Sequence, residues 1–397
     1  MVKKLKLSRL LLIQWLLATY SVQCFSITKL NSFDSTVSTG LISEQKGSDG
    51  TLFLTAADDT VLAVHEKIIH SLTTTPQIKI VVLAKSTDFF QEKFKIQIRS
   101  GQLLVLALES NDISLTGYQL PNWSRDFVGV GLKPDKNKKV IITLNYKTNN
   151  VLAGREKLQL AYQAAISKQF KNQIEFKSIN IYGEWGNAIF DDKGQLFLTE
   201  RTLQYNMPAV NRGELQPEKA QSANPDAYEK LRKNIEIKFL SAFKTEALKN
   251  IVWLPSLPST EESTGHIDMY ASIVESMHVV VSKSTDAEKE KTLDQIAAIF
   301  AGKGYKVDRL SLFYKKADPS FYSYTNTLRL KDQLFIPSYF DSKNNNSKSV
   351  QATDKAALEY YSNLKLYKKI VQIPVYDQIQ RGGAIHCLTS FVPFYLW

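Results

Sequence analysis

Segments with the pattern of strands alternate with segments with the pattern of helices along almost the whole chain, which has 397 residues. Short apolar runs rich in β-branched residues predict buried strands. They lie at residues 78–84, 94–98, 103–108, 140–146, 195–199, 251–254 and 369–375. Apolar residues at helical spacing predict helices at residues 155–170, 228–248, 286–300 and 354–364. Because the alternation continues without a break in composition, the sequence predicts an α/β fold.

Single residues refine this interpretation of the chain. Asp286 is expected to cap the helix that follows it, and Thr353 or Asp354 is expected to cap the next one. A hairpin is expected at residues 324–336, with its turn near residues 331–332. Two polar segments are expected to form surface loops, at residues 206–226 and 342–351.

The first 26 residues have the pattern of a secretory signal peptide. Four basic residues precede a mostly apolar run at residues 10–20, and small or polar residues follow at 21–26. We therefore expect residues 1–26 to be removed and the mature protein to be exported, either to a periplasm or out of the cell. A lipid anchor on Cys24 is the alternative, although Val22 and Gln23 before it are unlike the usual small-residue lipobox. No later run predicts a membrane span.

The chain carries a formal net charge of +11, which falls to +7 without the four basic residues of the first segment. The remaining basic residues are spread along the chain and form no dense block. This distribution predicts a solvated basic surface and gives no support for nucleic-acid binding.

The two cysteines are more informative than the charge. Cys24 lies at the end of the predicted signal peptide, so Cys387 is the only cysteine of the folded body. Exported proteins usually pair their thiols or lack them. A single retained thiol is therefore either an inert core residue or a reactive one.

Four short segments place ionisable or nucleophilic residues beside glycine or tryptophan, at residues 123–126, 183–187, 265–268 and 382–387. Taken singly, each has a structural explanation. The first segment could hold a surface ion pair, and Glu184 could lie on a hairpin turn. His266 and Asp268 are two residues apart, so in a strand they would share one face and could form an ordinary hydrogen bond. Cys387 could be a core residue.

Taken in order, these segments resemble the motifs of the agmatine deiminase and bacterial peptidyl-arginine deiminase family, part of the guanidino-group-modifying superfamily. The family's motifs are Trp-x-Arg-Asp, Glu-Gly-Gly-Asn, Gly-His-x-Asp, Ser-Tyr-x-Asn and Gly-Gly-Gly-x-x-His-Cys. The sequence has counterparts at residues 123–126, 184–187, 265–268, 323–326 and 381–387. Each motif alone is unspecific, but all five in order carry the resemblance, which covers about residues 120–393.

The resemblance implies a pentein-type fold, which is a pseudo-fivefold α/β propeller of ββαβ modules with the site in its central channel. Residues 27–397 would then form a single deiminase catalytic domain. The motifs would lie near the inner ends of the modules, which would bring residues far apart in sequence together.

The resemblance also implies a chemistry that suits these residue types. Carboxylates match the forked donors of a planar guanidinium cation, and Asp126 and Asp268 would hold it. Cys387 would attack its central carbon to form an S-alkylthiouronium. His266 would protonate the leaving ammonia and then activate water, which releases a ureido product.

Other residues of the motifs would support this reaction. Glu184 would hydrogen-bond His266 or the guanidinium, while Trp123 and Asn326 would lie around the substrate. No cofactor or metal is expected, since the five histidines and the one body cysteine show no zinc-ligand spacing. The expected partner is a small guanidinium compound or an arginine-containing peptide.

Departures from the family pattern leave the substrate open. Trp185 and Arg381 stand where the family usually has glycine, and Met269 follows the His-x-Asp motif. Agmatine, arginine and peptidyl-arginine are the candidate substrates, and export favours the last two. Two other functions remain open: an amidinotransferase or dihydrolase on the same fold, and a catalytically silent guanidine-binding protein in which Trp185 fills the channel.

Overall fold

Some strands of the structure, a computed structural model, are buried on both faces. In β1 (Gly50–Ala56), Leu52 and Leu54 face one hydrophobic cluster and Phe53 faces another. Burial on both sides explains why the neighbouring β2 (Ile78–Ala84) is a continuous apolar run. The structure describes residues 49–108, 122–135, 138–145, 155–170, 173–211, 213–258, 262–313, 320–340 and 349–396. These residues all belong to one compact unit of the chain.

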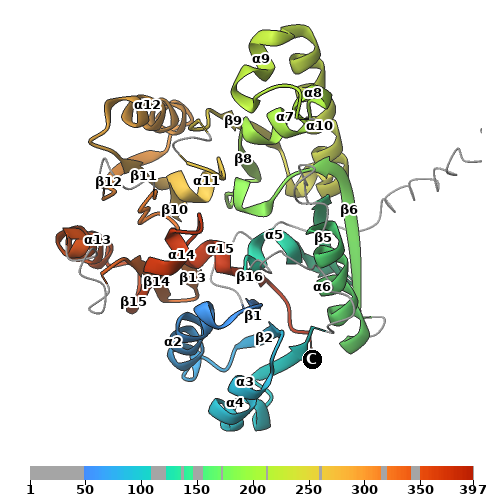
Figure 1. Ribbon diagram of the computed structural model, residues 1–397, viewed down its shortest axis with the longest axis vertical. Helices are drawn as coiled ribbons and strands as arrows, with labels where there is room; N and C mark the ends of the chain where they lie inside the picture. The colour runs from blue at the N-terminus through green and yellow to red at the C-terminus, as the bar shows by residue number, and fades with distance from the viewer. Residues whose placement is uncertain are drawn as a thin grey trace, which may run out of the picture. The chain divides into compact units, whose positions relative to one another are not determined.

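The described strands form five sheets with the same pairing pattern (Figure 1). In each sheet a first strand pairs antiparallel with a second, and the second pairs parallel with a third. One sheet joins the two ends of the described chain in the order β16 (Thr389–Val392), β1, β2 and β3 (Leu103–Ala107). The other sheets are β4 (Val130–Asp135), β5 (Lys138–Asn145) and β6 (Ile174–Tyr182); β7 (Ala188–Phe190), β8 (Gln195–Thr199) and β9 (Asn250–Leu254); β10 (Ala271–Glu275), β11 (His278–Lys283) and β12 (Lys306–Ser311); β13 (Leu328–Leu330), β14 (Gln333–Ser338) and β15 (Lys369–Pro374).

Helices connect the parallel strands of each sheet, as parallel pairing requires a crossover. They are α2 (Leu62–Leu72) after the short helix η2 (Asp59–Val61), then α3 (Asp88–Lys93) and α4 (Lys95–Arg99), α6 (Arg155–Gln169), α12 (Ala287–Gly302) and α13 (Gln351–Asn363). The crossover between β8 and β9 is longer and contains α7 (Arg201–Asn206), α8 (Pro208–Asn211), η6 (Pro217–Lys219), α9 (Ala220–Ala223) and α10 (Pro225–Ala247). Among the described residues, no helix is long and apolar enough to cross a membrane.

Four very short helices end just before the first strands of four sheets, and a fifth sheet has an irregular segment in the same place. The helices are α5 (Ser124–Val128), η5 (Trp185–Asn187), α11 (Ile267–Tyr270) and α15 (Ile385–Leu388), with α14 (Tyr376–Ile379) preceding α15. Since the first strand is antiparallel, its start lies beside the end of the second strand, as in the pairing of Thr389 with Leu54. The short helix α5 contacts both α15 and η5, and η5 contacts α11. Helices α5, α11 and α15 are labelled in Figure 1.

Most of the predicted elements are confirmed, including the Asp286 cap, whose side chain accepts from the backbone N–H groups of Glu288 and Lys289. The hairpin turn near residues 331–332 is confirmed as well, although β13 begins only at Leu328. The polar segment 206–226 contains short helices as well as loop. Residues 1–26 and most of the second predicted loop lie outside the described residues.

Two predictions were wrong. Residues 94–98 lie in α4 and the residue before it, because Phe94 and Ile98 face inward one helical turn apart while Ile96 is 77% exposed. Their alternation with polar residues imitated a strand. Helix α13 begins at Gln351, so neither Thr353 nor Asp354 is its cap. The Asp354 carboxylate instead accepts from the backbone of Tyr339, at 3.0 Å, and from the Tyr324 hydroxyl, at 2.7 Å.

Candidate active site

Each of the five motifs occupies the same place in its own sheet, immediately before the first strand. Asp126 lies in α5 before β4, and Glu184 caps η5 before β7. His266 caps α11 and Asp268 lies in its first turn, before β10. The two residues therefore do not share the face of a strand, which was one interpretation of their spacing. Asn326 and Cys387 precede β13 and β16, respectively, and complete the set of site residues.

The thiol of Cys387 is buried and lies between two polar partners. It donates a hydrogen bond to Asp268 Oδ2 over 3.4 Å and accepts one from Asn326 Nδ2 over 3.1 Å. Asn326 Oδ1 also accepts from the backbone N–H of His386 at 2.9 Å, so this amide fixes the cysteine segment. Burial, followed by the charges of Asp268 and Asp126, raises the pKa of the Cys387 thiol well above its usual value. At neutral pH the sulfur is therefore protonated.

His266 and Glu184 form a close pair, with 2.5 Å between Nε2 of the ring and Oε2 of the carboxylate. Burial alone would lower the pKa of His266. The adjacent Glu184 and the more distant Asp126 and Asp268 outweigh burial and raise the pKa to about 10. The imidazole is thus a cation at neutral pH and has a proton to give.

Asp126 is buried beside other acids. Burial and the charge of Glu184 are the main causes that raise its pKa to about 7, against the opposing effects of His266 and of the N–H of Gly186. That N–H donates to Asp126 Oδ1 over 3.2 Å. A carboxyl group whose pKa is near neutral pH because other acids surround it is suited to binding a cation.

Two glycines permit the close approach of these groups. A Cβ atom on Gly186 would lie 2.4 Å from His266 Nδ1, and one on Gly383 would lie 2.7 Å from the ring of Trp123. No Cβ of an ordinary residue fits at such distances, so both positions require glycine. Trp123 therefore lies against the cysteine motif, and its place beside the substrate stays a prediction.

His386 contacts the site as well, although the sequence analysis assigned it no role beyond being part of the cysteine motif. Its Nδ1 lies 2.7 Å from Asp268 Oδ2, the same oxygen that receives the thiol hydrogen bond. The other oxygen of Asp268 is buried without a hydrogen-bond partner among the described residues. His386 thus holds one carboxylate oxygen and leaves the other available to a ligand. The adjacent His-Cys pair was the only signal for this contact.

One atom each from Asp126, Glu184 and His266 lie within 4.8 Å of one another, which is a spacing that could hold a metal ion. However, the 2.5 Å between His266 and Glu184 is a hydrogen-bond distance. Two ligands of a tetrahedral zinc ion stand about 3.3 Å apart. The arrangement therefore fits a shared proton better than a shared metal.

A cavity with about 60 Å³ of space for water adjoins the site, enough for a few molecules. Asp268 and His386 line it, together with residues from the first strand of all five sheets: Val130, Gly131, Ala188–Phe190, Ala271–Ile273, Arg329 and Phe391. Trp185 also borders the cavity, but its ring packs against Phe190, Phe239 and Phe243. The tryptophan is therefore anchored in an aromatic cluster.

Comparison with solved structures shows that the fold is the α/β fold of agmatine deiminases. The C. jejuni agmatine deiminase is 16% identical, with a TM-score of 0.63, and the match covers 89% of this chain and 95% of that one. A putative arginine deiminase from Porphyromonas gingivalis is 15% identical, with a TM-score of 0.62 and coverage of 89% and 98%. The Enterococcus faecalis agmatine deiminase is 17% identical, with a TM-score of 0.59 and coverage of 90% and 96%.

A comparison of the sequence with protein-family models assigns the chain to a family. The family model for Porphyromonas-type peptidyl-arginine deiminases matches residues 53–393, so the chain belongs to this family of guanidino-group-modifying deiminases. The match begins well before residue 120, where the motif resemblance became clear. Comparison with curated proteins gave no match.

Proposed function

We propose that this protein is a guanidine deiminase that hydrolyses agmatine, arginine or peptidyl-arginine to a ureido product and ammonia. The observation that carries the proposal is the placement of the Cys387 thiol beside the Asp268 carboxylate, close enough to Asp126 that both charges raise its pKa. A thiol in such a place is inactive until a cation neutralises the carboxylates. A guanidinium has the required charge and the forked donors that carboxylates bind.

In the proposed reaction, Asp126 and Asp268 hold the guanidinium, and its charge lowers the pKa of the Cys387 thiol, which releases its proton to solvent. The sulfur attacks the central carbon, and protonated His266 gives its proton to the nitrogen that leaves as ammonia. Water then attacks the resulting thiouronium and gives one proton to His266. The carbon–sulfur bond breaks, the remaining hydroxyl proton passes to the leaving sulfur, and the ureido product is released with Cys387 again a thiol. Glu184 holds the imidazole in place through its 2.5 Å contact.

The proposed architecture is a pentein-type propeller of five modules around a central channel. Its support is the cavity that the first strands of all five sheets line, together with the motifs that precede those strands. A five-module arrangement explains why one site residue, or one pair, comes from each module. We also propose that residues 1–26 are a signal peptide for export, as their basic, apolar and polar pattern indicates. Mass spectrometry of the mature protein tests this, and a cytoplasmic product that retains Met1 would contradict it.

The function is tested by incubating the enzyme with agmatine, arginine and arginine peptides and measuring ammonia and ureido products together. Equal amounts of the two, lost in Cys387→Ala, are expected of a deiminase. Two ammonia molecules per ornithine would indicate a dihydrolase, and transfer of the amidine group to an added amine would indicate an amidinotransferase. Binding of these compounds without any product would leave a silent binding protein as the function.

A further inference from the structure

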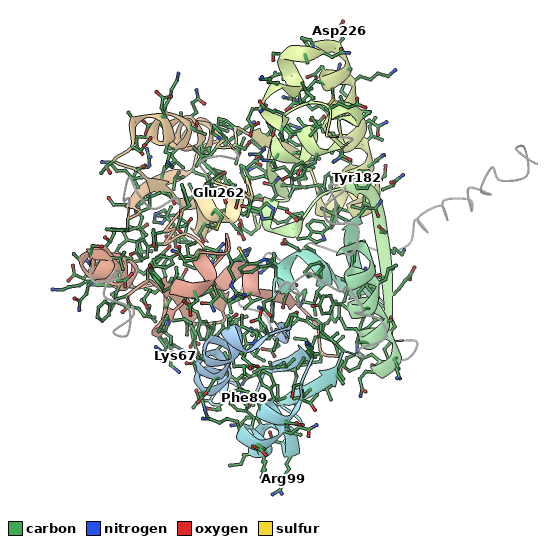
Figure 2. The ribbon with its side chains drawn as sticks, viewed as in Figure 1. Lys67, Phe89, Arg99, Tyr182, Asp226 and Glu262 are labelled. Carbon is green, nitrogen blue, oxygen red and sulfur yellow. The ribbon has the colours of Figure 1, made fainter. Side chains whose placement is uncertain are left out.

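Glu262 is a buried carboxylate close to the candidate active site. The proposed reaction gives it no role. It is 4% exposed and lies a few residues before α11 (Figure 2). Its Oε1 accepts from the backbone N–H of Thr264 at 3.0 Å and from the Thr264 hydroxyl at 2.8 Å. Its Oε2 accepts from the backbone N–H of Gly265 at 2.5 Å and from the Tyr270 hydroxyl at 2.9 Å. All four partners are donors, so the site is built for a group that only accepts.

These bonds fix the backbone on both sides of His266. The Thr264 hydroxyl that donates to Glu262 also accepts from the backbone N–H of His266 at 3.1 Å, which links the two residues in a chain of hydrogen bonds. Gly265 between them has a φ of +69°, a conformation that glycine adopts readily. Tyr270 ends α11, so the same carboxylate ties the residue before His266 to the end of the short helix that His266 caps.

The turn held by Glu262 has little room to move. A Cβ on Gly265 would lie 2.4 Å from Nε of the buried Arg201, which packs beneath it. On the other side, a Cβ on Gly382 would lie 3.1 Å from the Ser263 hydroxyl, so the turn also lies close to the cysteine motif. We therefore expect a substitution at Glu262 to displace both the segment around His266 and the cysteine motif.

We propose that Glu262 is a positioning residue that sets the orientation of His266 against Glu184 and Cys387. The inference rests on the proposed function, in which His266 moves the protons. An accurate donor position matters because a displacement of about 1 Å can cost about a hundredfold in rate. Substrate binding depends instead on Asp126 and Asp268, so Glu262 acts on turnover more than on affinity.

The matched test is Glu262→Gln, which keeps the shape but turns one acceptor oxygen into an NH₂ donor that faces donors. We expect kcat to fall at least about tenfold, with KM within about threefold. NMR titration of the His266 ring should show its pKa fall below the parent value of about 10, because the contact with Glu184 loosens. This titration needs no substrate, so it tests the inference even if the parent enzyme releases no ammonia.

Asp191 provides the control because it is a buried carboxylate with nearly the same set of partners. It accepts from the backbone N–H groups of Lys193 and Gln195, at 2.9 and 2.6 Å, and from the Tyr305 hydroxyl at 2.5 Å, in the turn between β7 and β8. Asp191→Asn should lower thermal stability in the same way as Glu262→Gln, yet leave kcat and the His266 titration unchanged.

If Glu262→Gln does not fold, Tyr270→Phe removes one of the four bonds and should lower kcat about two- to fivefold, by well under 1.4 kcal/mol. The inference is overturned if the folded Gln variant keeps kcat within about twofold and an unshifted His266 titration. It is equally overturned if Asp191→Asn has the same effect on both, or if Tyr270→Phe, used in its place, has none.

Discussion

The Asp268 carboxylate accepts a hydrogen bond from the Cys387 thiol over 3.4 Å. A carboxylate next to a thiol opposes ionisation of the sulfur, and burial adds to that effect. The same oxygen of Asp268 is held by His386, while its other oxygen has no hydrogen-bond partner among the described residues. In the proposed reaction this pair holds Cys387 in its unreactive, protonated form and keeps one oxygen of Asp268 available for the guanidinium cation.

Asp268→Asn should have opposite effects on the two reactions of Cys387. Because a negative charge is removed, the thiol pKa falls, and alkylation by neutral iodoacetamide at pH 8 should become faster, by up to about tenfold for each pKa unit. Turnover of every guanidine substrate should fall at least about tenfold, since a charge-assisted contact is lost. Asp126→Asn should act in the same directions. Slower alkylation, or turnover within about threefold of the parent, would show that these carboxylates do not act on the thiol as described.

Guanidine binding should strengthen as pH rises through about 7. The pKa of Asp126 is raised to about 7 by burial and by Glu184, so below that pH a cation must displace a proton. The dissociation constant should therefore increase about tenfold for each pH unit below 7 and become constant above pH 7. Calorimetry on Cys387→Ala, which binds without turnover, measures this directly. Asp126→Asn should remove the dependence, and a profile that is the same in both proteins would assign it to another group.

Gly186→Ala should lower kcat at least about tenfold, because the added Cβ would lie 2.4 Å from His266 Nδ1 and must displace the imidazole. Gly302→Ala is the control, since a Cβ there, at the end of α12, meets nothing within 4 Å. Steady-state kinetics should find the Gly302 variant within twofold of the parent. Full activity in Gly186→Ala would mean that the imidazole does not need its present position.

His65 should make the fold sensitive to acid. It is fully buried in α2, neither ring nitrogen has a hydrogen-bond partner among the described residues, and burial lowers its pKa to about 3. Between about pH 6.5 and 3 the unfolded chain binds a proton that the folded one does not. The free energy of unfolding therefore decreases as the pH is lowered, by up to about 1.4 kcal/mol per pH unit.

Urea unfolding at pH 7 and pH 5 measures the effect of His65. His65→Leu should reduce the difference between the two pH values and raise stability at pH 7 by about 1 kcal/mol, because an unsatisfied polar group is removed. His70→Leu is the control, since its side chain is 51% exposed on the same helix. Equal behaviour of the two variants would contradict this account of His65.

The sequence was sufficient to select the candidate site residues, but residue patterns alone did not explain why they lie close together. The motifs supplied Asp126, Glu184, His266, Asp268 and Cys387, each in a short segment that contains a glycine or tryptophan. Their equivalent positions in the fold were implied only by the family resemblance, because the five sheets share a strand-pairing pattern and not a sequence motif. Contacts such as that of Glu262 with Tyr270 depend on how a turn folds back on a short helix, and residue spacing does not contain that information.

Local patterns failed where tertiary contacts decided the outcome. The alternation of Phe94, Ile96 and Ile98 fits a strand as well as one face of a helix with an exposed isoleucine. Asp354 has the right residue type for a cap, but its carboxylate is taken by the backbone that follows β14. In both cases the sequence allowed two structures, and packing against a distant segment selected one.

The central claim is that Cys387 is a nucleophile that becomes reactive when a guanidinium-like cation lies between Asp126 and Asp268. The most direct measurement compares the rates at which the empty enzyme is labelled by neutral iodoacetamide and by cationic chloroacetamidine, with the modified peptide identified by mass spectrometry. The account predicts slow labelling by the first reagent and fast labelling of Cys387 by the second, with the selectivity lost when both aspartates are changed to asparagine. Equal resistance to both reagents, or selectivity that persists without the two carboxylates, would contradict it.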